Sequence, residues 1–196
     1  MSMLSIIVPA YNEEKIINKT ADVISGLMVN AGIEYELLFI NDGSKDNTWL
    51  EIMGKANSNK NIKGICFSRN FGKEAAIFAG LDNCIGDCAV VIDCDLQHPP
   101  EKILEMYKLW EEGYEVVEGV KSSRGNESVI HKFVVGIFYK IMSKITNIDM
   151  KNASDFKLID RKVIEALKSM PERNTFFRAL SSWCGFKSTR ILFEVR

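Results

Sequence analysis

Two kinds of apolar pattern alternate along the first half of the chain. Short, mostly apolar segments predict strands over residues 4–9, 35–40 and 62–67, and the continuous apolar run 88–92 predicts a buried one. Between them, apolar residues at helical spacing predict helices over 13–29, from Asp46 through Met53, and over 73–81. Asp46 is placed to cap the second of these helices. The alternation predicts an α/β fold with a mostly parallel central sheet flanked by helices.

Polar residues follow each of the four predicted strands. The segments are Tyr-Asn-Glu at 11–13, Asn-Asp-Gly at 41–43, Ser-Arg-Asn at 68–70 and Asp-Cys-Asp at 93–95. The carboxyl ends of parallel strands meet at one edge of a sheet, and ligands bind beyond that edge. We therefore expect the four segments to converge on a single crevice.

The acidic segment after the fourth strand predicts a metal site. Carboxylates at the end of a buried strand are costly unless a cation neutralises them, and hard oxygen donors suit Mg²⁺ or Mn²⁺. We predict Asp95 as the principal ligand, Asp93 as co-ligand or ribose contact, and Gln97 as a further ligand through its carbonyl oxygen. His98 could reach the same ion, but a surface histidine beside a proline is the preferred interpretation. An Asp-rich turn before a helix is the structural alternative.

Size and composition are consistent with one domain. The chain has 196 residues, a mass of 22.2 kDa and a formal net charge of −1, which suits a single sizeable core and gives no indication of a nucleic-acid partner. Its 5 cysteines are odd in number and lie mostly in apolar segments, so we expect free thiols in a reducing compartment. The first strand begins almost at once, so we expect no signal peptide, and no segment approaches the roughly 20 apolar residues of a membrane span.

Several motifs, in order along nearly the whole chain, resemble the family 2 glycosyltransferases with the GT-A fold. The similarity is strongest to the polyisoprenyl-phosphate subfamily, which includes bacterial undecaprenyl-phosphate glucosyltransferases and dolichol-phosphate mannose synthase. The motifs are VPAYNE at 8–13, NDGS at 41–44, RNFGKE at 69–74, DCDLQHPP at 93–100, ASDFKLIDRKV at 153–163, and the segment 176–186.

The resemblance implies a GT-A (Rossmann-like) catalytic domain that performs a metal-dependent, inverting transfer. The donor would be a nucleotide diphosphate sugar, with UDP-glucose as the best guess, and the acceptor a polyisoprenyl (undecaprenyl) phosphate at the cytoplasmic face of the membrane. Such a transfer expels a nucleoside diphosphate, so a divalent cation would stabilise the charge that develops on the β-phosphate. The residues that the resemblance assigns to the nucleotide are Pro9, Ala10, Tyr11, Glu13, Asp42, Arg69, Lys73 and Asp93.

The resemblance also assigns residues to the acceptor side. Asp155 matches a proposed catalytic aspartate, and Lys121 with Arg124 matches a basic pair that would clamp phosphate. The oxygen of a lipid phosphate is already anionic near neutral pH, so it needs a general base less than a sugar hydroxyl does. The alternatives are a solvated basic loop for Lys121 and Arg124, and for Asp155 an ion pair with Arg161 or a backbone turn.

Residues 1–120 would form the nucleotide-sugar half and 121–196 the acceptor half of one catalytic domain that spans residues 1–196. Apolar residues over 128–148 lie on one helical face and three lysines lie off it, which suits either a core helix or a helix at a membrane surface. The run 191–195 looks like an interior strand with nothing after it. Since the resembled enzymes continue into transmembrane helices, we expect this chain to belong to a longer, membrane-anchored protein; a homo-oligomer is also possible.

Other functions remain as alternatives. The sugar could be mannose, an N-acetylhexosamine or aminoarabinose, the acceptor a glycan, or the domain could bind a nucleotide sugar without turnover of its own. A nucleotidyltransferase would normally carry a Gly-rich basic loop after the first strand, and a dinucleotide-dependent oxidoreductase a Gly-x-Gly-x-x-Gly motif. Neither is found in the Pro-Ala-Tyr-Asn-Glu segment at 9–13, which argues against both classes.

Overall fold

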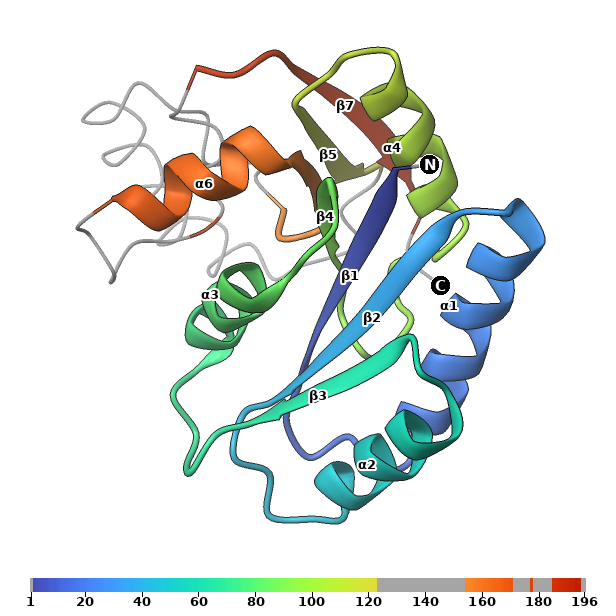
Figure 1. Cartoon of the computed structure of the whole chain (residues 1–196), viewed down its shortest axis with the longest axis vertical. Helices are drawn as coiled ribbons and strands as arrows, with labels where there is room; N and C mark the ends of the chain where they lie inside the picture. The colour runs from blue at the N-terminus through green and yellow to red at the C-terminus, as the bar shows by residue number, and fades with distance from the viewer. Residues whose placement is uncertain (1, 123–153, 171–176, 178–184, 195–196) are drawn as a thin grey trace, which may run out of the picture.

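The computed structural model describes residues 2–122, 154–170, 177 and 185–194. These residues form a seven-stranded sheet in the order β3-β2-β1-β4-β6-β5-β7 (Figure 1). The strands are β1 (Met3–Ala10), β2 (Glu34–Asn41), β3 (Ile62–Cys66), β4 (Cys88–Val91), β5 (Val116–Lys121), β6 (Lys157–Asp160) and β7 (Ser188–Phe193). The helices are α1 (Ile17–Ala31), α2 (Thr48–Ser58), α3 (Lys73–Asn83), α4 (Lys102–Glu111) and α6 (Arg161–Ser169).

The sheet is mostly parallel, as the sequence predicted. β1 pairs in parallel with β2 and β4, β2 pairs in parallel with β3, and β5 pairs in parallel with β7. Only β6, among the described strands, runs antiparallel to both of its neighbours, β4 and β5. The expectation of an interior strand near residues 191–195 was wrong: β7 lies at an edge of the described sheet, where Leu192 is 64% exposed.

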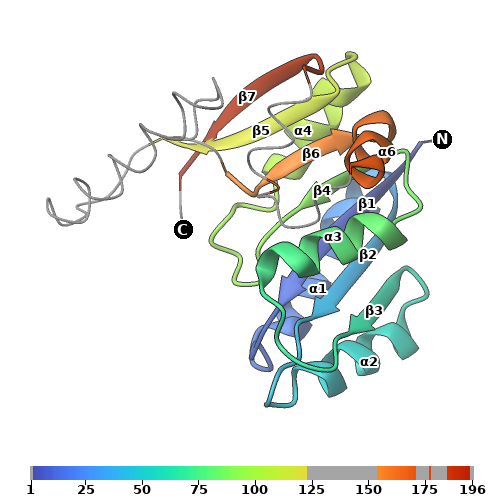
Figure 2. The same ribbon diagram turned by 90° about the vertical axis from the view of Figure 1, so that its left-hand side faces the viewer.

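Helices cover both faces of the sheet. Figure 2 shows α3 and α6 together on one face, while α1, α2 and α4 lie on the other. Successive side chains of β1 pack alternately against the two helical layers, because neighbouring side chains of a strand point to opposite faces of the sheet. Ile6 and Val8 pack with α1, α2 and α4, whereas Ile7 packs with α3 and α6. The sheet is thus the middle of three layers, with an apolar core on each side.

The helix starts differ slightly from the predictions. α1 begins at Ile17 rather than at Glu13, because the carbonyl of Glu13 accepts the N–H groups of Ile16 and Ile17 in a preceding turn. The N-cap of α2 is Asn47 rather than the predicted Asp46, which lies one residue earlier. Asp46 still bonds to the start of the helix, because its Oδ1 accepts the N–H of Thr48 at 3.1 Å and the Thr48 hydroxyl at 2.5 Å.

Some sequence predictions fall outside the described residues. They are Arg124, the helix predicted over 128–148, and most of the segment 176–186. Within the described ranges, no helix is long and apolar enough to cross a membrane. The thiols of Cys84, Cys88 and Cys94 are free and buried, as expected, whereas Cys66 is exposed.

Candidate active site

A cavity of about 320 Å³ opens at the carboxyl ends of β1, β2 and β4. From β1 the chain passes to β2 on one side, while β4 adds to β1 on the other side. Such a reversal of strand order leaves a crevice in which α/β proteins bind ligands. The cavity is lined by Pro9, Ala10, Tyr11, Glu13, Asp42, Asn70, Gly72, Lys73, Asp93, Cys94 and Asp95.

Most of the residues predicted from sequence therefore lie together. On the predicted donor side, Gln97 and Arg69 do not line the cavity: Gln97 is exposed, and the guanidinium of Arg69 stacks on Phe71, with Cζ 4.2 Å from the ring centroid. On the predicted acceptor side, Asp155 and Lys121 also lie outside the lining. The lining also includes Asn70, Gly72 and Cys94, which lie inside the predicted segments but had been given no individual role. The segments therefore located the site more fully than the roles assigned to single residues did.

Asp42 holds the loop before α3. Its Oδ1 accepts the N–H of Phe71 at 2.7 Å, and its Oδ2 accepts the N–H of Gly72 at 2.9 Å. Gly43 has φ 65°, and a Cβ at this position would overlap the backbone of Arg69. The end of β2 and the loop 69–72 are therefore in close contact, and both carboxylate oxygens of Asp42 bond to backbone in this structure.

The loop that carries Asp93 and Asp95 is stabilised by a hydrogen bond inside the loop and by one from α1. Leu96 has φ 58°, an unusual value for a non-glycine residue, and the N–H of Gln97 donates to Asp95 Oδ1 at 3.0 Å. Beneath the loop, the buried hydroxyl of Thr20 donates to the carbonyl of Cys94 at 2.7 Å. These contacts set the directions in which Asp93 and Asp95 leave the backbone.

Lys73 connects the two sides of the site. Its Nζ lies 2.5 Å from Asp93 Oδ1 and 3.0 Å from Asp155 Oδ2. Burial lowers the pKa of Lys73, but the charges of Asp93 and then Asp155 outweigh it and raise that pKa above its usual value. Lys73 is the first residue of α3, and Asp155 precedes β6 and is buried. One ammonium thus joins the predicted donor carboxylate to the predicted acceptor carboxylate.

His98 is buried, so its interpretation as a surface histidine was wrong. Its ring stacks on Phe156, with centroids 5.0 Å apart, and meets Phe193 edge-on at 5.2 Å. Those rings come from later segments that cover the loop after β4. His98 Nδ1 is 3.7 Å from Asp93 Oδ2 and has no hydrogen-bond partner within the described part of the chain. Burial lowers the pKa of His98, so the ring is neutral at neutral pH.

Negative charge is concentrated in the cavity. The pKa of Glu13 is raised first by burial and then by the carboxylates of Asp95, Asp46 and Asp93. Carboxylate oxygens in this setting fit Mg²⁺ or Mn²⁺. In the described ranges, no three His, Cys, Asp or Glu side chains lie close enough together to hold a metal ion. A cation at Asp93 and Asp95 would thus complete its shell with other oxygens, such as those of a diphosphate or water.

The segment before β6 is held by Glu118 of β5. Glu118 Oε1 accepts the N–H of Ser154 at 3.2 Å and lies 3.2 Å from the buried Nζ of Lys157, while Oε2 accepts Arg190 Nε at 3.0 Å. This network supports the backbone next to Asp155. Lys121, the last residue of β5, is exposed.

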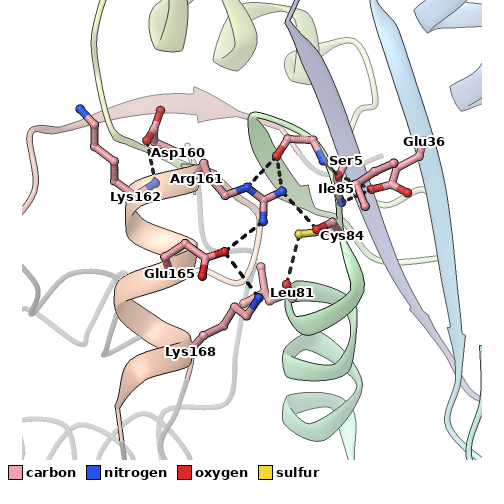
Figure 3. Close-up of polar contacts among 11 residues, drawn as sticks. Ser5, Glu36, Leu81, Cys84, Ile85, Asp160, Arg161, Lys162, Glu165 and Lys168 are labelled. Carbon is pink, nitrogen blue, oxygen red and sulfur yellow. Dashed lines mark hydrogen bonds and ion pairs between the residues drawn. The ribbon is translucent and has the colours of Figure 1, made fainter.

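The alternative role of Asp155 as a partner of Arg161 receives no support. The guanidinium of Arg161 donates instead to the carbonyls of Cys84 and Gly86, at the other end of β4 (Figure 3).

A model of glycosyl transferase family 2 matches residues 5–168, and the chain belongs to this family. The chain is 47% identical over 189 residues to "Uncharacterized glycosyltransferase YkcC" of Bacillus subtilis (strain 168), covering 95% of this chain and 58% of the relative. It is 39% identical over 186 residues to "Prophage bactoprenol glucosyl transferase homolog" of Escherichia coli (strain K12), covering 94% and 61%. The chain thus spans about three fifths of the length of these relatives.

Solved structures show the same fold. The crystal structure of glucosyl-3-phosphoglycerate synthase from M. tuberculosis superimposes with a TM-score of 0.68 at 20% identity, covering 100% of this chain and 72% of that one. The complex of that synthase with Mn²⁺, UDP-glucose and phosphoglyceric acid gives a TM-score of 0.62 at 20% identity, covering 83% and 57%. The GT-A fold expected from the motifs is therefore confirmed, and the family is that of a glycosyltransferase rather than a nucleotidyltransferase or an oxidoreductase.

Proposed function

We propose that this domain transfers a hexose, with glucose as first choice, from a UDP-sugar to a polyisoprenyl phosphate at the cytoplasmic face of a membrane. The observation that carries the proposal is the placement of Lys73 between Asp93, at the end of β4, and Asp155, before β6. The candidate diphosphate site at Asp93 and the candidate acceptor site at Asp155 are therefore adjacent, because the same Lys73 ammonium contacts both. The relative named as a bactoprenol glucosyl transferase homolog supports both the sugar and the lipid.

On the donor side, we assign the nucleotide to the cavity formed by Pro9, Ala10, Tyr11, Glu13 and Asp42. Asp93 and Asp95 would hold Mg²⁺ or Mn²⁺ together with the diphosphate, and the cation would stabilise the charge that develops on the leaving phosphate. The Mn²⁺ and UDP-glucose bound to the M. tuberculosis synthase support this choice. Gln97 and Arg69 remain further candidates, which a bound donor would have to bring toward the cavity.

On the acceptor side, the phosphate oxygen of the lipid would attack the anomeric carbon of the sugar. The new bond joins that carbon to the acceptor phosphate, and the bond to the β-phosphate breaks, with its electron pair leaving on UDP. An acceptor oxygen that is already anionic needs no proton removed, so Asp155 would orient rather than deprotonate. We assign Lys121 and Arg124 to the acceptor phosphate.

Ligand-induced stabilisation tests the donor assignment. Melting temperatures would be measured with UDP, UDP-glucose, GDP and GDP-mannose, in Mn²⁺ and in EDTA. A ligand present at about 100 times its Kd should add about 2.7 kcal/mol to the free energy of unfolding. We expect that gain with UDP ligands only when Mn²⁺ is present, and we expect Asp95→Asn to lose most of it. Equal stabilisation in EDTA would refute the metal role, and a preference for GDP ligands would refute the choice of UDP.

A transfer assay tests the acceptor assignment. Membranes containing a full-length protein with this domain would be incubated with UDP-[¹⁴C]glucose and undecaprenyl phosphate. We expect label in a lipid that mild acid cleaves to glucose. Nucleotide binding without transfer to any polyprenyl phosphate would instead support a binding domain or a different acceptor.

A further inference from the structure

The ammonium of Lys73 lies where a cation at Asp93 would be expected. It is 2.5 Å from Asp93 Oδ1, while Asp155 Oδ2 lies 3.0 Å from the same nitrogen. We propose that Lys73 is a built-in counter-ion of Asp93, that the divalent cation must displace it before the donor diphosphate binds, and that the displaced Lys73 stays with Asp155 and faces the acceptor phosphate. This inference rests on the proposed glycosyl transfer and adds a regulation of the same site.

The displacement follows from geometry and charge. A small divalent cation binds a carboxylate oxygen at about 2.0–2.1 Å, so it needs the space close to Asp93 Oδ1 that the ammonium now fills. Two like charges on one oxygen also repel strongly at such short range. Among the described residues, Asp95 has no ion pair, and its Oδ1 accepts the backbone N–H of Gln97. Asp95 can therefore offer an oxygen to the metal without first losing a cation.

Asp93 has a second partner available once Lys73 leaves. His98 Nδ1 is buried, lacks a hydrogen-bond partner in the described ranges, and lies 3.7 Å from Asp93 Oδ2, too far for a hydrogen bond. A small rotation of the Asp93 carboxylate lets Oδ2 accept the His98 Nδ1–H, while Oδ1 binds the cation. Metal ligands are commonly oriented by such a hydrogen bond to their other atom. The orphaned nitrogen is therefore satisfied in the metal-bound arrangement.

The exchange also orders the two substrates. Without metal, Lys73 ties Asp155 to the donor side, so the ammonium is shared between two carboxylates and contributes little attraction to an incoming phosphate. With metal at Asp93, the ammonium keeps Asp155 as its carboxylate partner within the described residues, and its attraction for the acceptor phosphate increases. The metal and donor should accordingly bind first and the lipid phosphate second.

Mn²⁺ affinity without nucleotide provides the direct test. Electron paramagnetic resonance of free Mn²⁺ would be used to titrate the wild type, Lys73→Met, Lys73→Arg and Lys55→Met. Lys55 is the matched control, because it forms an ion pair with Asp22 at 2.7 Å on the α1–α2 side of the sheet. Lys73→Met should bind Mn²⁺ about tenfold more tightly than the wild type, whereas Lys73→Arg and Lys55→Met should stay close to it.

The possible results distinguish a failure of this inference from a failure of the proposed glycosyl transfer. If wild type binds Mn²⁺ with UDP but Lys73→Met gains no affinity, Lys73 does not compete and the inference fails alone. If Lys55→Met gained as much Mn²⁺ affinity as Lys73→Met, the gain would come from the more negative net charge of the protein. That result would also overturn the inference about Lys73. If no variant binds Mn²⁺, with or without UDP, both the metal role and the inference fall. The side chains of Lys73 and Lys55 are 41% and 21% exposed, so neither substitution replaces a fully buried group, and melting temperatures would verify that the variants fold.

Discussion

The hydroxyl of Thr20 donates a 2.7 Å hydrogen bond to the backbone carbonyl of Cys94, a residue 74 positions away in the sequence. Thr20 lies on the inner face of α1 and is fully buried, and Cys94 separates the two candidate metal ligands. α1 thereby fixes the height of the acidic loop above the sheet. The Thr20–Cys94 hydrogen bond takes no part in catalysis, but it helps to determine the positions of Asp93 and Asp95.

Thr20→Val should damage both stability and the site. Valine keeps the volume but removes the donor, which leaves a buried carbonyl unsatisfied at a cost of about 1–3 kcal/mol. Urea denaturation should show that loss, and calorimetry should show weaker binding of UDP with Mn²⁺. Thr20→Ser keeps the hydroxyl and is the control, with most of the binding retained. Full UDP affinity in Thr20→Val would mean that the loop is held without this bond.

Asp42→Asn should loosen the loop before α3. Both oxygens of Asp42 accept backbone N–H groups, from Phe71 and Gly72, and an asparagine can offer only one oxygen to them. The amide would place a donor against a donor, so we expect a loss of about 1.5–3 kcal/mol in the free energy of unfolding. Hydrogen exchange at the N–H groups of Phe71 and Gly72 should accelerate. Unchanged exchange at both amides would show that Asp42 does not hold this loop and that its carboxylate is available to bind the nucleotide instead.

Two glycines in helices should respond in opposite ways to alanine. A Cβ at Gly80 of α3 would overlap the side chain of Ile7 in β1, so Gly80→Ala should cost about 1–3 kcal/mol. Gly54 of α2 has nothing within 4 Å of such a Cβ, so Gly54→Ala should stabilise the protein by about 0.5–1 kcal/mol. Denaturant midpoints would measure both. A stable Gly80→Ala protein would mean that α3 can move away from the sheet at little cost.

Local patterns were sufficient to predict the first half of the sheet. The segments that form β1 and β2 are mostly apolar, β4 is a continuous apolar run, and the acids at 93 and 95 come directly after it. Strand type, burial and the position of these carboxylates are all determined within a few residues. For that reason the pattern could predict that the polar segments after β1, β2 and β4 meet at one crevice, while the roles of single residues in the nucleotide site came from the family resemblance.

Relationships between distant segments could not be predicted in this way. The strand β6 has a buried lysine at its start, Lys157, whose charge is balanced by Glu118 of β5, so an apolar run does not mark it. The burial of His98 depends on Phe156 and Phe193, which come from the last third of the chain. No spacing rule connects Lys73 with Asp155, and only the folded sheet brings them together.

A final prediction concerns pH and a carboxylate at the opposite end of the sheet from the cavity. Glu36 is buried, and its Oε1 accepts the Ser5 hydroxyl and the Ile85 N–H, each at 2.6 Å (Figure 3). Burial alone would raise the pKa of Glu36, but the Ile85 N–H, the Ser5 hydroxyl and Lys63 together lower it below its usual 4.5. A lowered pKa means that the ionised form is bound better in the folded state than in the unfolded state.

The stabilisation by Glu36 should therefore be complete above pH 4.5 and disappear as the pH falls through the lower, folded-state pKa. At pH 7 we expect Glu36→Gln to cost about 1.5–3 kcal/mol, since the lost hydrogen bonds are made to a charged acceptor. The difference from the wild type should shrink when urea denaturation is repeated at progressively lower pH below 4.5. Glu105→Gln, which removes a carboxylate from the exposed pair with Lys102, is the control and should change stability little at any pH. A Glu36→Gln deficit that stays constant on acidification would show that shape, and not charge, makes this position important.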